Sequence, residues 1–79
     1  MGTVHRAFGF RFVVFPNDHL PPHVHVFGHG GEAKIELSVT RKPVITWMVG
    51  ITRADMRRIF AEVQEQHAVL LDAWRTING

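Results

Sequence analysis

Apolar and polar residues alternate through the middle of the chain. In residues 32–39 (EAKIELSV) every second residue is apolar, which is typical of a strand with one buried face. Residues 23–27 (HVHVF) alternate in the same way after Pro21 and Pro22, which favour extended backbone. The turn residues of 28–31 (GHGG) join the two segments. We therefore predict strands at 23–27 and 32–39 that form a hairpin.

The register of this hairpin follows from a tight turn centred on residues 29–30. On one face this register pairs apolar residues only: Val26 with Ala33 and Val24 with Ile35. The other face carries the polar pairs, His23 with Glu36 and His25 with Lys34. Matching apolar residues across strands is what a half-buried sheet requires. We therefore expect His23 and His25 to point away from the core.

Two further segments have strand character. Residues 8–15 (FGFRFVVF) are aromatic and β-branched and end at a turn-forming Pro-Asn-Asp sequence. In a strand over this range, Phe8, Phe10, Phe12 and Val14 would share one face. Residues 43–49 form either a short fourth strand or an extended connection, and Pro43 would place such a strand at a sheet edge.

Helical spacing dominates the last third of the chain. Apolar or partly apolar residues recur at intervals of four and three: Met56, Phe60, Val63, His67, Leu70, Trp74 and Ile77. Thr52 followed by Asp55 resembles the sequence that caps a helix N-terminus. This pattern predicts a helix over about 53–77, either as one long helix or as two in line.

These elements predict an α+β fold with one domain over residues 1–79. We expect a small antiparallel sheet of three or four strands, packed on the C-terminal helix or helices. A continuous helix over 53–77 would be roughly 37 Å long at about 1.5 Å per residue. A helix of that length would extend beyond so small a sheet, so we expect a homodimer or a protein partner to cover it.

Composition restricts the class of protein. The 79 residues are 46% hydrophobic and 20% charged, contain no cysteine, and carry a formal net charge of +2. The chain is therefore globular in composition, and any metal would have to be held by histidines and carboxylates. No apolar run approaches the roughly 20 residues that cross a membrane, and the first residues lack a signal-peptide pattern. We expect a cytoplasmic protein without a membrane partner.

Histidines are concentrated in residues 17–32 (NDHLPPHVHVFGHGGE), which hold four of the six. Because residues i and i+2 of a strand project from one face, His23 and His25 place two imidazoles side by side. His19 can reach the same point from the Pro-rich bend, and Asp18 or Glu36 can add a carboxylate as a ligand or as a partner of an imidazole N–H. The candidate metal ligands are therefore His19, His23 and His25, for Zn²⁺ or another divalent transition metal. The alternative is a polar strand with a structural or contact role.

Basic residues form a second candidate site. Arg41, Lys42, Arg53, Arg57 and Arg58 are five of the nine lysines and arginines. Positive charges at the N-terminus of the predicted helix oppose its dipole, which indicates contact with phosphate or with an acidic partner. The alternative is a solvated helix face shared with acidic residues.

The motif Asp18-His19-x-Pro21-Pro22-His23-x-His25-Val26 resembles the signature of a bacterial family of short proteins of unknown function. The family also has an aromatic strand before the motif and a Leu-Leu-x-x-Trp element after it, here residues 70–74. The resemblance singles out His19, His23 and His25. It further implies a protein partner, because genes of the family often lie in arrangements that look like toxin–antitoxin pairs.

The sequence therefore favours a non-catalytic interaction module, one half of a toxin–antitoxin-like pair, whose exposed histidine-lined sheet face is a candidate site for a divalent metal. One alternative is a small metal-dependent hydrolase or nuclease. A second alternative is a nucleic-acid-binding regulator.

Overall fold

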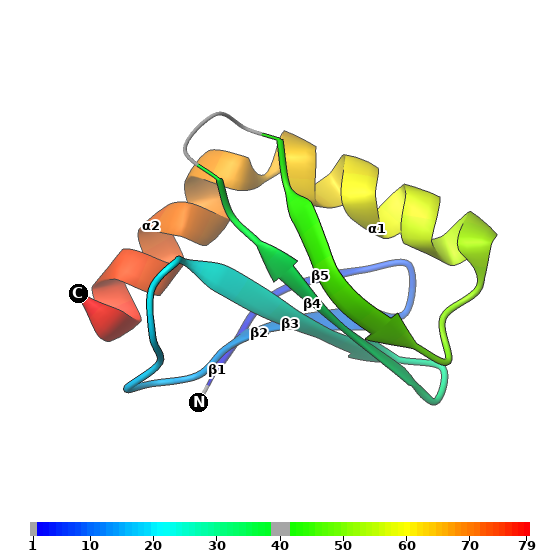
Figure 1. The fold of residues 1–79 in the computed structure, drawn as a ribbon, viewed down its shortest axis with the longest axis horizontal. Helices are drawn as coiled ribbons and strands as arrows, with labels where there is room; N and C mark the ends of the chain where they lie inside the picture. Colours follow the sequence, from blue (N-terminus) through cyan, green and yellow to red (C-terminus); the bar gives the residue numbers. More distant parts are fainter. Residues whose placement is uncertain (1, 39–41) are drawn as a thin grey trace.

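Five antiparallel strands and two helices make up the computed structural model, which describes residues 2–38 and 42–79 (Figure 1). The strands are β1 (Gly2–Ala7), β2 (Phe10–Val14), β3 (His23–Gly28), β4 (Gly31–Glu36) and β5 (Val44–Val49). They lie in the sheet in chain order. The helices are α1 (Arg53–Glu65) and α2 (His67–Asn78), and both lie on the same face of the sheet. Neither α1 nor α2 has the length and apolar character needed to cross a membrane.

The fold class is the predicted α+β, but the sheet has one more strand than expected. β1 was not predicted, because residues 2–7 (GTVHRA) show no regular alternation of apolar and polar residues. The predicted strand at 8–15 is also too long, since Phe8 and Gly9 have φ of 56° and 81° and form a two-residue turn between β1 and β2. Phe8 is therefore 51% exposed instead of lying with the core residues of β2.

The β3–β4 hairpin has the predicted register. The observed pairs include Val24 with Ile35 and Val26 with Ala33, on the face that the helices cover. His29 and Gly30 form the turn with φ of 50° and 78°, a conformation whose twist matches that of antiparallel strands. Strand β4 ends at Glu36, and the end of the predicted range, Val39, lies outside the described residues.

The helical region divides at Gln66 into two helices that meet at an angle (Figure 1). A continuous helix over 53–77 would be roughly 37 Å long at about 1.5 Å per residue, whereas the longest dimension of the molecule is 32 Å. The division lets α2 turn back over β1, β2 and β3, with which it makes its sheet contacts. The expectation of a long or in-line helix is therefore corrected, while the predicted cap is confirmed, since the Thr52 hydroxyl accepts a hydrogen bond from the Asp55 N–H at 3.1 Å.

The core lies between the helices and the covered face of the sheet. It contains alternate residues of β2, β3 and β4, the residue that follows β4, and one side of each helix: Phe10, Phe12, Val14, Val24, Val26, Ala33, Ile35, Leu37, Met56, Ile59, Val63, Leu70, Leu71 and Trp74. His67 is buried among them, and its Nε2 contacts the Ser38 carbonyl. The predicted helical stripe is thus correct at most positions, but Ile77 is 37% exposed.

Leu70→Ala should strongly destabilise the protein, because Leu70 is 0% exposed in the centre of the core. Removal of a buried leucine side chain leaves a cavity and costs about 2–5 kcal/mol. Val69→Ala is the matched control, since Val69 is 56% exposed on the same helix, and should change stability by less than about 0.5 kcal/mol. Urea unfolding of both variants measures the difference, and equal losses would contradict the placement of α2.

Candidate metal centre

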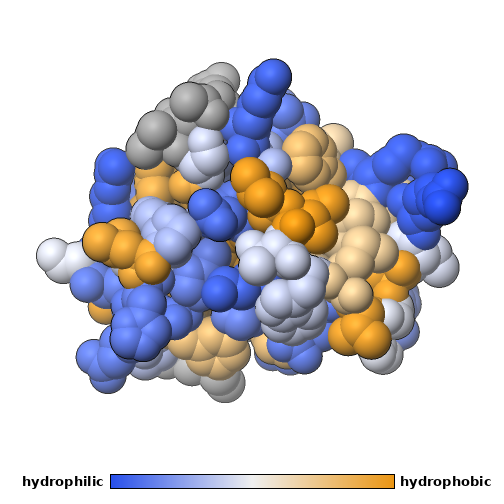
Figure 2. All heavy atoms as spheres, viewed as in Figure 1, coloured by the Kyte–Doolittle hydropathy of each residue, from blue (hydrophilic) through white to orange (hydrophobic). Residues whose placement is uncertain are grey.

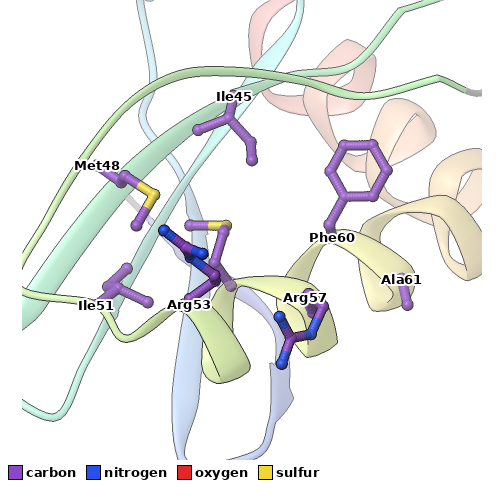
Figure 3. A pocket seen from close by; sticks show the side chains of 8 residues that line it. Ile45, Met48, Ile51, Arg53, Arg57, Phe60 and Ala61 are labelled. Carbon is purple, nitrogen blue, oxygen red and sulfur yellow. The ribbon is translucent and has the colours of Figure 1, made fainter.

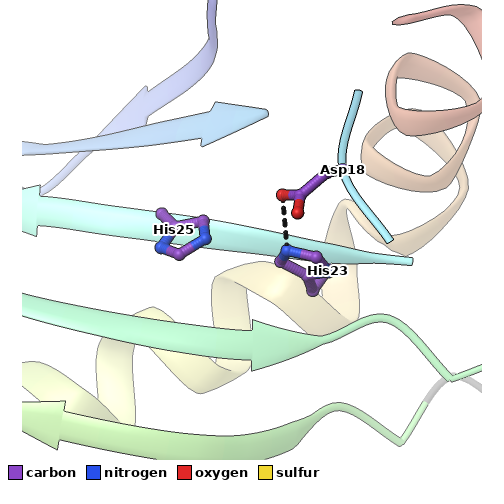
Figure 4. A group of neighbouring side chains, drawn as sticks. All are labelled: Asp18, His23 and His25. Carbon is purple, nitrogen blue, oxygen red and sulfur yellow. Dashed lines mark ion pairs between the residues drawn. The ribbon is translucent and has the colours of Figure 1, made fainter. Parts of the chain in front are cut away.

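Asp18, His23 and His25 come together on the face of the sheet that the helices leave open (Figure 4). Each residue offers one ligand atom, and the three atoms lie within 4.8 Å of one another. Two are imidazole nitrogens and one is a carboxylate oxygen. The side chains come from β3 and from the loop between β2 and β3.

Strand β3 positions the two histidines. Val24 and Val26 point into the core with 0% exposure, so His23 and His25, which alternate with them, point to the opposite face. The predicted orientation of these rings is therefore correct. The face is less exposed than predicted, however, because His23 is only 4% exposed beneath the β2–β3 loop.

The β2–β3 loop carries Asp18, and the end of α2 holds this loop in place. The Asp18 N–H donates to the side-chain oxygen of Asn78 at 2.9 Å, and the Asn78 Nδ2 donates to the Phe15 carbonyl at 3.0 Å. Within the loop, the His19 N–H donates to Asp18 Oδ1 at 3.1 Å. The other carboxylate oxygen, Oδ2, is thereby directed toward the sheet.

Both ring nitrogens of His23 face oxygen acceptors. Nδ1 lies 2.9 Å from the Pro21 carbonyl, which can only accept, so Nδ1 carries a proton and donates it. Nε2 lies 2.7 Å from Asp18 Oδ2. A second proton on Nε2 satisfies this contact as an ion pair. A metal ion held by both atoms would require Nε2 and Oδ2 to move apart, with Nδ1–H fixing the orientation of the ring.

His25 lies among aromatic rings and forms no hydrogen bond within the described part of the chain. Its ring is edge-on to Phe15 with centroids 4.9 Å apart, and Phe27 and Trp47 each lie 6.3 Å away. Its Nδ1 is buried, and the nearest carboxylate oxygen, on Glu32, is 3.9 Å away, which is too long for a hydrogen bond. His25 therefore has a buried nitrogen without a partner.

The surroundings shift the pKa values of two members of the group. Burial lowers the pKa of His25 below its ordinary value of 6.5, and electrostatic repulsion from His23 lowers it further. Burial raises the pKa of Asp18, but the His19 N–H and the neighbouring His23 outweigh this, so the pKa lies below 3.8. At neutral pH the site therefore presents an ionised carboxylate and a neutral His25 ring. Both are the forms that bind metal ions.

A small pocket of about 110 Å³ adjoins Asp18 and His23. Lys34, Glu36 and Thr46 line its sheet side, and His19 and Leu20 line its loop side. The pocket brings an ammonium group, a carboxylate and a hydroxyl close to the candidate ligands. It provides room for a small molecule or for water beside Asp18 and His23.

The remaining predicted site residues lie outside this group. His19 is exposed and contributes a backbone N–H and a wall of the pocket, while Glu36 pairs with His23 across the strands and also lines the pocket. Lys42, Arg53, Arg57 and Arg58 are exposed, and Arg41 lies outside the described residues. Arg58 lies 3.4 Å from Asp55. The structure therefore places Asp18, which precedes His19 in the sequence, beside His23 and His25, and His19 lies outside this group.

Sequence reasoning missed two polar contacts. Asn78 was not identified as a functional residue, although its side chain holds the loop that carries Asp18. His5 lies 2.6 Å from Glu62 on the covered side of the sheet. Both contacts join residues more than fifty positions apart, so no local pattern in the sequence could indicate them.

A family model described as "Domain of unknown function (DUF4160)" matches residues 9–75. The chain belongs to this family. The matched range covers strands β2–β5, helix α1 and most of helix α2, and it includes all three members of the candidate metal centre. Comparison with curated proteins and with solved structures gave no significant match.

Lowering the pH should destabilise this DUF4160 protein through His25. The pKa of His25 in the folded protein is below 6.5. At pH values between this pKa and 6.5, the unfolded chain therefore binds a proton on His25 that the folded protein does not bind. The free energy of unfolding therefore falls as the pH drops through 6.5. A His25→Gln variant lacks this contribution. As the pH is lowered from about 7.5 to about 5.5, the free energy of unfolding of this variant should rise relative to that of the wild type. Urea unfolding measures this difference, and parallel pH profiles of the two proteins would contradict the assignment.

Proposed function

We propose that Asp18, His23 and His25 bind a divalent transition-metal ion, and that the chain is a metal-binding interaction module. The observation that carries this proposal is the convergence of three ligand atoms within 4.8 Å, one of them on a ring whose buried nitrogen has no hydrogen-bond partner. A buried polar atom without a partner costs about 1–3 kcal/mol. A bound ion would coordinate a nitrogen of the His25 ring, which forms no hydrogen bond in the described part of the chain.

The geometry requires little rearrangement for such an ion. Ligand atoms arranged tetrahedrally at about 2.1 Å from a metal lie roughly 3.4 Å apart. His23 Nε2 and Asp18 Oδ2 are 2.7 Å apart and would separate slightly, while the ring of His25 would move closer. The hydrogen bond from Nδ1 of His23 to the Pro21 carbonyl can persist, because the ion would use the other ring nitrogen.

The donor set defines the class of ion. Two imidazole nitrogens and one carboxylate suit Zn²⁺ and other divalent first-row transition metals. Ca²⁺ and Mg²⁺ prefer sites made of oxygen atoms alone. A site with three protein ligands would also leave a coordination position open, and the small pocket adjoins two of the three ligands, Asp18 and His23.

A protein partner is the second part of the proposal. It is supported by the resemblance described above, which implies a partner because genes of that family often lie in arrangements that look like toxin–antitoxin pairs. A 79-residue chain buries only about 60% of the surface of its unfolded form, so a partner would add stability that the small core does not supply. In such a pair this chain would act by binding its partner, with the metal holding the β2–β3 loop against the sheet.

Zn²⁺ should raise the melting temperature of the wild-type protein. At a free concentration one hundred times the Kd, a site that exists only in the folded state adds about 2.7 kcal/mol, which corresponds to roughly 10–20 °C in a domain of this size. Asp18→Asn and His25→Ala should each lose most of this increase, measured by calorimetric scanning with and without Zn²⁺.

Two controls make this experiment specific. His19→Ala removes a neighbouring histidine whose ring is exposed, and it should retain the increase. Mg²⁺ at the same concentration should give no increase, because the site offers only one oxygen ligand. If Zn²⁺ leaves the melting temperature of the wild type unchanged, Asp18 and His23 form only an ion pair that fixes the loop.

Metal-dependent hydrolysis is a second candidate function, and the small pocket beside the ligands favours it. Lys34 lines this pocket together with Asp18 and His23, so an anionic group could lie next to a bound ion with its charge neutralised. Hydrolysis of bis(p-nitrophenyl) phosphate with Zn²⁺ or Mn²⁺ tests this function. We expect Asp18→Asn and Lys34→Ala to abolish any turnover. Activity that survives both substitutions would contradict catalysis at this site. The absence of activity in a protein shown to bind the metal would contradict it as well, and the function would then be that of a non-catalytic module.

A further inference from the structure

Strand β5 forms an unprotected edge of the sheet. It pairs with β4 on one side only, and all six of its residues (VITWMV) are exposed. Its apolar side chains are between 36% and 63% exposed: Val44, Ile45, Trp47, Met48 and Val49. Natural edge strands normally carry charged residues or proline that prevent pairing with another chain. β5 has neither within its length.

The opposite edge of the sheet differs. β1 has a β-bulge between Thr3 and His5, and it carries Arg6 as well as the ion pair between His5 and Glu62. Charged residues are among the features that protect an edge strand. The pairing of β4 with β5 also contains a bulge, between Lys34 and Ile35, so the charged residues of β1 are what distinguish the two edges. The apolar strand β5 is therefore the edge better suited to accept a further strand.

An apolar groove of about 710 Å³ runs between β5 and α1 (Figure 3). Ile45 and Met48 of β5 lie on one side, and Phe60 and Ala61 of α1 lie on the other. In the space-filling view, hydrophobic side chains gather over β5 (Figure 2). The free edge of β5 and the groove therefore form one continuous apolar surface.

Two arginines give this groove a positive charge. Arg53 and Arg57, on the first two turns of α1, both line it, and no acidic residue does. Neither arginine forms an ion pair within the described residues, whereas Arg58, on the same helix, lies 3.4 Å from Asp55. An occupant that carries carboxylates would complement these charges.

We propose that the groove and the free edge of β5 bind an extended, acidic segment of another protein as a sixth strand. Its backbone would pair with β5, and its apolar side chains at alternate positions would enter the groove. One or two carboxylates would reach Arg53 and Arg57. A second copy of this chain fits less well, because it would bring its own two arginines to the same surface. The inference deepens the proposed protein partnership and is independent of the metal.

Selection from a phage-displayed library of random dodecapeptides on the full chain tests the proposal. We expect enrichment of acidic peptides with apolar residues at alternate positions. Fluorescence anisotropy of the best synthetic peptide should give a Kd that increases at least tenfold in the Arg53→Glu, Arg57→Glu double variant. The matched control is Arg58→Glu, which should bind within twofold of the wild type because Arg58 does not line the groove.

Hydrogen exchange identifies the mode of binding. Bound peptide should slow the exchange of backbone amides in β5 and leave those of β1 unchanged, since only β5 gains a neighbour. Asp18→Asn should bind the peptide as the wild type does, so a failure of the metal site and a failure of this inference are distinguishable.

Three results would overturn the inference. The first is the absence of enriched peptides. The second is binding that is unaffected by charge reversal at Arg53 and Arg57 in variants that unfold like the wild type. The third is a concentration-dependent dimer, seen by light scattering, in which the amides of β5 are protected without any peptide, because a second copy would then occupy the edge.

Discussion

One-sided coverage of the sheet is the constraint on which the structure depends. Because α1 and α2 both pack on the same face, alternate residues of the central strands divide between a closed core and an open face. Val24 and Val26 provide two of the contacts that close the core, and the residues between them necessarily point outward. The candidate metal centre is therefore a consequence of how β3 is buried. Its two histidines cannot change face without exposing the valines.

Polar groups on the open face are held by partners from distant parts of the chain. The buried ring of His23 is compatible with the fold because Pro21 and Asp18 provide an acceptor for each nitrogen. Asn78 at the end of α2 fixes the loop that supplies Asp18. His25 is the exception, since aromatic rings surround it and no acceptor or donor reaches its buried nitrogen. The two histidines of the candidate metal centre therefore differ in their polar contacts.

Strand β5 contributes to two surfaces of different character. Thr46 lies beside the candidate metal centre, and Trp47 lies near the ring of His25. Ile45 and Met48 line the groove on the helix side. A β-bulge in the pairing of β4 with β5 places Thr46 and Trp47, which are neighbours in sequence, on the same face. The metal centre and the proposed docking groove therefore share one edge strand but use different residues of it.

The sequence by itself determined the elements that depend only on residues close together in the chain. Alternation in residues 23–27 and 32–39, together with the tight turn between them, was sufficient to predict the register of β3 and β4 and the direction of His23 and His25, because side-chain facing in a strand repeats every two residues. Only the tertiary structure decided the features that depend on contacts between distant residues. These are the pairing of β1, the division of the helix at Gln66, and the presence of Asp18 instead of its neighbour His19 beside the histidines. Asn78, sixty positions away in the sequence, holds Asp18 in place through a hydrogen bond that no periodicity in the sequence could predict.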